Sequence, residues 1–151
     1  MIRLSRKTEY GLLALSHLRA AAPDELCSAK DIAAHYQIPP SLLAKVMQRL
    51  KHAGLVTSTK GTSGGYALAS DLSETSFLEF MHLFDEDTAL VECLTDTDSS
   101  SCQQAHTCGI RNPIAALNEA ILDQLRALKL SELIQPLPTS GTLVSLESLH
   151  R

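Results

Sequence analysis

The sequence predicts a mainly α-helical fold with one small β-hairpin and a long C-terminal helix. Three patterns in its 151 residues support this prediction. Apolar residues recur at helical spacing through much of the first half of the chain. Two short β-prone segments flank a glycine-rich stretch at 59–65, which is typical of a hairpin. An apolar repeat of roughly heptad spacing then runs from about 112 to 130, which is typical of a long helix.

Helices are expected in sequence over the first third of the chain. The first runs from about Ser5 to Ala21, where apolar residues repeat at helical spacing. Ser28 and Asp31 have the spacing of a capping box, which predicts a helix of about two turns. Proline at position 40 suits the first turn of a further helix, which is expected to continue until Gly54. Two short helices joined by a tight turn form a helix-turn-helix arrangement.

The predicted hairpin follows the second short helix directly. Its β-prone segments are 55–58 and 66–69. The glycines between them do not form a phosphate-binding loop, because the G-x-x-x-x-G-K-[ST] pattern is absent and no helix follows at once. A hairpin in this position makes the whole stretch a winged helix-turn-helix.

The second half is expected to hold a short helix, a long loop and a long helix. An aromatic stripe predicts the short helix and belongs to its core face: Phe77, Phe80, Met81 and Phe84. From Asp85 to Arg111 the periodicity disappears, and a loop of that length normally has a function. Asn112 is predicted to cap the long helix with Pro113 at its first position. The apolar stripe that needs a partner is Ile114, Leu117, Ile121, Leu125 and Leu128.

Charge divides the chain into two unlike parts. Residues 1–68 contain nine Lys and Arg against four acids, whereas residues 69–151 contain four basic and thirteen acidic residues. The overall charge of −4 therefore averages a basic head and an acidic body. A basic helix-turn-helix module fits binding to nucleic-acid phosphates.

The helix over 40–53 is expected to insert into the DNA major groove, as second helices of this motif do. Its apolar side turns Leu42, Leu43, Val46 and Leu50 inward. The residues left to face DNA are Ser41, Ala44, Lys45, Gln48 and Arg49. Gln48 suits adenine, and Lys45 or Arg49 suits guanine or phosphate. Lys60 and Ser63 on the wing complete the predicted contacts. The alternative is that these are solvated surface charges on a winged helix that binds another protein.

The cysteines indicate metal or redox chemistry. The chain lacks an apolar run that could cross a bilayer and a signal-peptide core, so we expect a cytoplasmic protein with reduced thiols. Three thiols form a C-x8-C-x5-C pattern in the loop: Cys93, Cys102 and Cys108. Thiolates bind zinc or iron–sulfur clusters, and a zinc site would take a fourth ligand from His106 or His82. Cys27 is expected to be a small buried residue. No nucleophile and base pattern supports an enzyme.

These residues resemble the Rrf-two family of winged-helix transcription regulators, which includes IscR, NsrR and RirA. The resemblance covers nearly the whole chain and lies in four places: the N-terminal stretch 4–12, the stretch 50–56 after the third helix, the wing at 61–68 and the three cysteines before the C-terminal helix. It implies a homodimer that binds palindromic promoter DNA. It also implies a [2Fe-2S] or [4Fe-4S] cluster that senses iron, cluster supply, nitric oxide or redox state.

On this resemblance Cys93, Cys102 and Cys108 are the cluster ligands. The first gap between cysteines is eight residues here, where familiar members mostly have five. Some members use a histidine three residues after the last cysteine, and this chain has Arg111 there. Others use an acid in the first helix, reached from the partner subunit, which implies Glu9 as the fourth ligand. His106 is the competing candidate.

We therefore expect four parts. The winged helix-turn-helix DNA-binding domain spans 1–84, and the cluster-binding loop spans 85–111. A dimerisation helix occupies 112–135, and a flexible tail occupies 136–151. A regulator that uses zinc or a thiol switch without a cluster is the alternative within the same fold.

Overall fold

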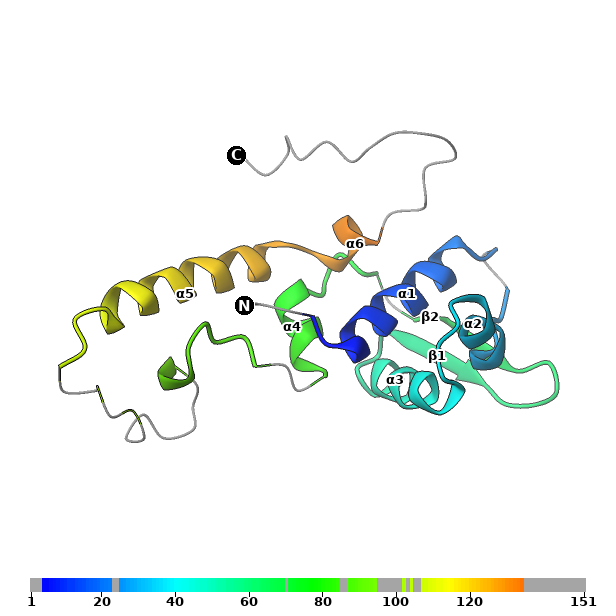
Figure 1. Ribbon diagram of the computed structural model, residues 1–151. Helices are drawn as coiled ribbons and strands as arrows, with labels where there is room; N and C mark the ends of the chain where they lie inside the picture. The colour runs from blue at the N-terminus through cyan, green and yellow to red at the C-terminus, as the bar shows by residue number, and fades with distance from the viewer. Residues whose placement is uncertain are drawn as a thin grey trace, which may run out of the picture.

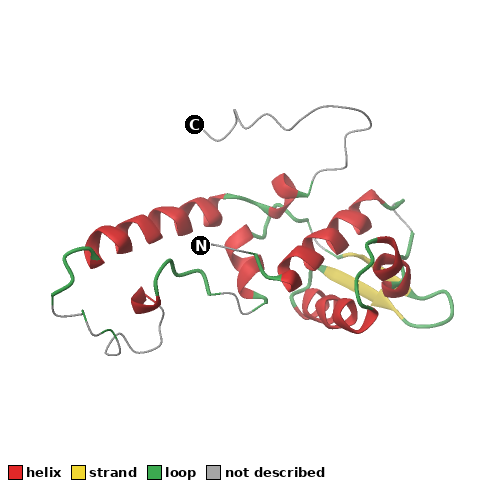
Figure 2. Cartoon of the chain, in the orientation of Figure 1, coloured by secondary structure: helices red, strands yellow, loops and turns green. Residues whose placement is uncertain are grey.

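The structure is a computed structural model that describes residues 4–22, 25–69, 71–84, 87–94, 102, 104 and 107–134. Its elements are α1 (Arg6–Ala20), α2 (Ala29–His35), α3 (Pro40–His52), β1 (Val56–Thr59), β2 (Gly65–Leu68), α4 (Phe77–His82), the 3-10 turn η1 (Glu92–Leu94), α5 (Arg111–Ala127) and α6 (Leu130–Leu133). Helices α1 to α3 and the hairpin pack together at one end, α4 lies beside them, and α5 extends away on the far side of α4 (Figures 1 and 2). The mainly α fold with one hairpin is as predicted.

The starts of the first three helices follow the signals in the sequence. The Ser5 hydroxyl accepts a hydrogen bond from the Thr8 backbone N–H at the start of α1. The Ser28 hydroxyl does the same for Asp31 N–H, at 3.1 Å, which confirms the predicted cap of α2. Helix α3 begins at Pro40, where a missing N–H costs no intrahelical bond. The helix-turn-helix is therefore confirmed.

The wing is a two-stranded antiparallel hairpin in which Val56 pairs with Leu68 and Thr59 with Gly65. The first strand begins and ends one residue later than predicted, and the second begins and ends one residue earlier. A Cβ at Gly64 would clash with the Thr59 carbonyl oxygen, so only glycine fits this tight turn. The backbone of Cys27 also pairs with Tyr66, by hydrogen bonds of 3.0 and 2.8 Å, and ties the hairpin to the segment before α2.

The core joins the helix-turn-helix and the hairpin to α4. Helix α3 contributes Leu43, Val46, Met47 and Leu50, all of them buried. Helix α4 contributes the first three residues of the predicted stripe, and Phe84 follows its end. Phe80 is fully buried and packs edge-on against Phe84. An ideal Cβ at Gly11 would lie only 2.9 Å from Phe80 and 3.0 Å from Phe84. Helix α4 therefore packs closely on α1 at this glycine.

The prediction of a single helix through 112–135 is wrong at both ends. Helix α5 begins at Arg111 after Ile110, and no side chain caps it, so Asn112 and Pro113 lie inside its first turn. That position suits proline because first-turn N–H groups have no intrahelical partner. The helix ends at Ala127, where the Leu128 carbonyl accepts from Phe77 N–H and Ser76 pairs with Lys129. A separate α6 follows, with Leu130 fully buried in the core.

The expected tail at 136–151 lies outside the described residues. None of the helices in the described ranges is long and apolar enough to cross a membrane.

Candidate functional site

The exposed side of α3 carries most of the side chains predicted to contact DNA. Ser41, Lys45 and Gln48 are exposed, opposite the buried apolar side of the helix. On the wing, Lys60 and Ser63 are exposed at the turn between β1 and β2. The described part of the module therefore presents polar and basic groups on both the helix and the wing, which together can contact bases and phosphates.

Arg49 differs from these residues. It is half-buried, and its Nη1 donates a hydrogen bond of 2.5 Å to the carbonyl oxygen of Leu83, at the end of α4. A guanidinium at a helix C-terminus satisfies a carbonyl that has no helical partner and favours the negative end of the helix dipole. The predicted DNA contact of Arg49 therefore stays a prediction, and in this structure at least one of its N–H groups is used inside the chain.

The three cysteines of the predicted cluster loop are free thiols, and each is half-buried. Cys93 lies in η1, and the Cys102 thiol donates to Oε1 of Gln104 at 3.7 Å. Cys108 lies three residues before α5. Within the described residues, no three His, Cys, Asp or Glu side chains lie close enough to hold a metal ion. The structure thus supplies the thiol donors and does not gather them.

The segment 87–94, here called the Cys93 arm, is fixed to α5 by a buried side chain. Asn118 is 6% exposed, and its Oδ1 accepts a hydrogen bond of 2.9 Å from the Leu90 backbone N–H. A buried amide that satisfies a loop N–H holds the loop in one position, because leaving either group unpaired costs free energy. The sequence gives no local sign of this contact, since Leu90 and Asn118 are 28 residues apart.

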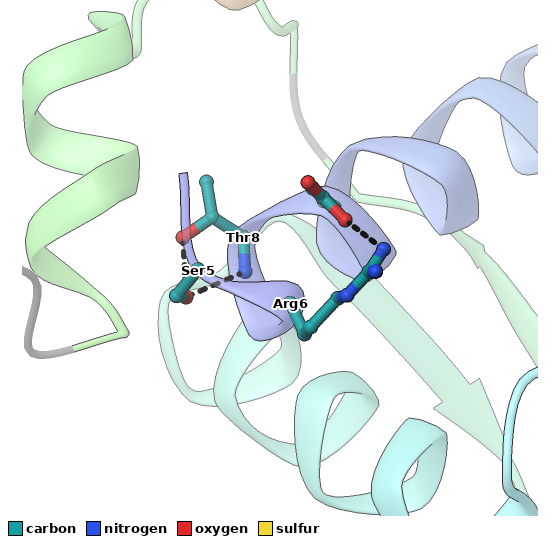
Figure 3. Close-up of polar contacts among 4 residues, drawn as sticks. Ser5, Arg6 and Thr8 are labelled. Carbon is teal, nitrogen blue, oxygen red and sulfur yellow. Dashed lines mark hydrogen bonds and ion pairs between the residues drawn. The ribbon is translucent and has the colours of Figure 1, made fainter. Parts of the chain in front are cut away.

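Glu9, the predicted acidic ligand, lies in the first turn of α1. Its carboxylate forms an ion pair of 2.9 Å with Arg6, shown in Figure 3, and its side chain is 40% exposed. Within one chain it is not grouped with the described cysteines. An exposed ion pair of this type is weak, so it does not prevent the carboxylate from binding a metal ion. The competing candidate, His106, lies outside the described residues.

Cys27 is buried, as predicted. It lies just before α2, where its backbone pairs with Tyr66, and not in the loop that holds the other three thiols. Burial raises the pKa of its thiol, and the carboxylates of Glu25 and Asp31 raise it further. A thiol with a raised pKa is a poor nucleophile and a poor metal ligand at neutral pH, because the thiolate is the reactive form. This supports a structural role for Cys27.

Sequence comparison places the chain among transcription regulators. The model of the Rrf2 family, described as iron-dependent transcriptional regulator, matches residues 4–136. The chain is 34% identical over 127 residues to the HTH-type transcriptional regulator NsrR of Bacillus subtilis, covering 84% of each protein. It is 33% identical over 138 residues to the putative regulator BadM of Rhodopseudomonas palustris, covering 91% of this chain and 85% of BadM.

Solved structures share the fold. CymR of B. subtilis, described as the global cysteine regulator, superposes with a TM-score of 0.66 at 25% identity, over 89% of this chain and 97% of CymR. IscR of T. potens superposes with a TM-score of 0.64 at 19% identity, over 93% of this chain and 94% of that structure. The relatives are named as regulators, in agreement with the prediction that the chain is not an enzyme. The chain is thus a winged-helix, DNA-binding transcription regulator that belongs to the Rrf2 family.

Proposed function

We propose that this regulator binds palindromic promoter DNA as a homodimer and that an iron–sulfur cluster on Cys93, Cys102 and Cys108 sets its DNA affinity. The observation that carries the proposal is the set of three free, half-buried thiols between α4 and α5, in a chain whose family model is described as iron-dependent. The signal would be iron, cluster supply, nitric oxide or redox state, because each changes the occupancy or oxidation of a cluster.

The donor set fits a cluster in its chemistry. Thiolates are soft ligands that iron–sulfur clusters require, and none of the four cysteines is used in a disulfide. Two of the three lie beside ordered elements, Cys93 in η1 and Cys108 just before α5. Since metal ligands are commonly assembled only when the metal binds, the separate thiols are compatible with a site that forms on loading.

The fourth ligand is proposed to be Glu9 from the partner subunit. Its carboxylate is partly exposed at the start of α1, where it forms a weak ion pair with Arg6. Oxygen is a harder donor than thiolate, so it would leave one iron comparatively labile and open to a signal molecule. His106, two residues before Cys108 in the sequence, remains the alternative ligand.

The DNA-reading residues are proposed to be Ser41, Lys45 and Gln48 on α3, with Lys60 and Ser63 on the wing. Their exposure on one module supports this assignment. Gln48 would form a bidentate contact with adenine, and the lysines would bind phosphate or guanine. In a twofold dimer two such modules would bind two half-sites about one helical turn apart, which requires a palindromic operator.

Anaerobic purification followed by absorption spectroscopy and iron and sulfide analysis tests the cluster. We expect a brown protein with stoichiometric sulfide, and loss of colour in Cys93→Ser, Cys102→Ser and Cys108→Ser but not in Cys27→Ser. Glu9→Ala should change the spectrum and the DNA affinity together, whereas an effect of His106→Ala alone would move the fourth ligand to that histidine. A colourless wild-type protein after reconstitution with iron and sulfide would refute the cluster.

A thiol switch or zinc site on the same cysteines is the second candidate. The similarity to CymR, whose S. aureus relative was also solved in an oxidised form, favours it, as does the absence of a preformed group of ligands among the described residues. On this reading the protein contains zinc or forms reversible thiol oxidation products, and no iron. Elemental analysis of anaerobically purified protein, with mass spectrometry before and after peroxide, separates the two candidates.

A further inference from the structure

We infer that Arg49 is a positioning residue that transmits movement of the Cys93 arm to the DNA-reading helix α3. This inference rests on the proposed function for its biological input, a cluster on Cys93. It goes beyond that function by assigning the connection between the sensing segment and the reading helix to one side chain. The argument depends on three contacts that meet at α4.

The first contact is between α3 and α4. Arg49 donates to the Leu83 carbonyl from a position next to Gln48 and four residues after Lys45, both proposed to face DNA. A hydrogen bond from a charged donor is about twice as strong as a neutral one. Arg49 lies on the same helix as the residues proposed to contact DNA. A displacement of Leu83 would therefore change the position of α3.

The second contact fixes the other end of the path. The chain continues from Phe84, which is buried in the core, to Cys93 in η1 within nine residues. Along this path Leu90 N–H is held by the buried Oδ1 of Asn118 on α5. A ligand that moves Cys93 therefore acts on a segment that α5 holds at Leu90, three residues away, while residues 85 and 86, between Phe84 and this segment, lie outside the described residues.

The third contact makes α4 a junction. At its N-terminal end the Phe77 N–H donates to the Leu128 carbonyl, at 2.8 Å, just after α5. Its aromatic residues pack closely on α1 at Gly11, two residues from Glu9. The end of α5 and the start of α1 therefore both contact α4, and Arg49 on α3 forms a hydrogen bond with the end of α4. Packed elements of this kind shift between discrete positions.

The test measures hydrogen–deuterium exchange of the α3 amides in the full-length protein. The arm is perturbed in three ways: by reconstitution with iron and sulfide, by Asn118→Leu, which removes the acceptor, and by Leu90→Pro, which removes the donor. Each perturbation should change α3 exchange at least about fivefold in the wild-type background, within the usual range of coupling between sites. Circular dichroism confirms that each variant is folded, and the two substitutions serve as independent checks on each other.

The same perturbations are then repeated in Arg49→Met. We expect their effect on α3 to disappear there and to be partly retained in Arg49→Lys, which keeps one donor. Lys51→Met is the matched control, since it removes the same charge from the last turn of α3 at an exposed position. It should respond as the wild type does.

Equal responses in Arg49→Met and the wild type would overturn the inference, as would an unchanged α3 when either arm substitution is made in the wild type. Iron and sulfide content is measured in parallel. If the wild type takes up no cluster, the proposed function fails, and the two arm substitutions still decide whether Arg49 provides the coupling.

Discussion

Replacing Leu117 and Ile121 of α5 with aspartate is expected to convert the proposed homodimer into monomers. Leu117 is 51% exposed and Ile110 is 68% exposed, while Asn118 is the buried residue of the helix. Helical geometry places Leu117 and Ile121 on one side of α5, away from Glu119. This side is the apolar surface that a second copy of the chain would cover.

The size of the effect follows from burial and charge. Full burial of a leucine side chain contributes roughly 1.5–3 kcal/mol, so covering the exposed half of Leu117 contributes about 1 kcal/mol in each subunit. An aspartate there would bring an unpaired carboxylate into the interface, which costs several kcal/mol for each copy. Because a twofold interface contains every substitution twice, the dimer affinity should fall at least about 1,000-fold.

Sedimentation velocity across a range of protein concentrations measures this change, and thermal unfolding monitored by circular dichroism checks the fold. Leu117 is exposed within one chain, so its replacement alone should change the free energy of unfolding by less than about 1 kcal/mol. Ala116→Asp is the matched control, because it adds the same charge at an exposed neighbouring position on another side of α5. An unchanged dimer in the double variant, or equal dissociation by Ala116→Asp, would refute the reasoning.

Three further predictions concern the caps, the thiols and the DNA contacts. Hydrogen bonds from the side chain and then the backbone of Ser76 lower the pKa of Glu79. This capping box therefore stabilises the fold above the ordinary pKa of about 4.5, and its contribution is lost as the pH falls through the lower folded pKa. Between pH 5.5 and about 3 the melting temperature should fall less in Glu79→Gln than in the wild type. Alkylation followed by intact mass spectrometry should add three groups before the fourth, with Cys27 last, and modification of Cys27 first would contradict its burial. Gln48→Ala should relax base preference at a cost of about 1–3 kcal/mol per lost bidentate contact, whereas Lys60→Ala should weaken all duplexes alike and reduce the salt slope by about one; binding to base-substituted duplexes at several salt concentrations distinguishes these roles.

Local signals in the sequence predicted the DNA-binding module well. The hydroxyl of Ser28, the proline at the start of α3 and the glycines of the wing act within a few residues, so their effects can be inferred from spacing alone. The buried aromatic residues of α4 were also predictable, because their helical spacing defines one apolar side.

Arg49 shows where such reasoning stops. Periodicity places it beside Gln48 on the polar side of α3, and the sequence holds no sign of the carbonyl it binds 34 residues later. Asn118 is a similar case, since a polar residue in an apolar helix gives no indication of the loop N–H that it satisfies. Long-range polar contacts depend on the tertiary arrangement, which local patterns do not specify.

The cysteine loop is predictable in its chemistry and not in its geometry. Residue type alone shows that Cys93, Cys102 and Cys108 can bind soft metals, and the structure confirms that they are free thiols. In the proposed site, which atoms meet would depend on a bound group and on a second subunit, neither of which the spacing encodes. For this reason the fourth ligand is a matter for the Glu9 and His106 variants.

The C-terminal apolar repeat illustrates how the fold divides one pattern between two uses. The heptad-like spacing runs without interruption as far as Leu128, and it predicted one long helix that needs a partner. The hydrogen bond from Phe77 N–H to Leu128 and the pairing of Ser76 with Lys129 end α5 there, because these backbone groups are taken by the segment before α4. Leu125 and Leu128 then pack against the chain's own core, and Leu130 is fully buried in it. The apolar surface left for a second subunit is therefore the earlier half of the stripe, so substitutions near Leu117 should affect assembly and substitutions at Leu130 should affect folding.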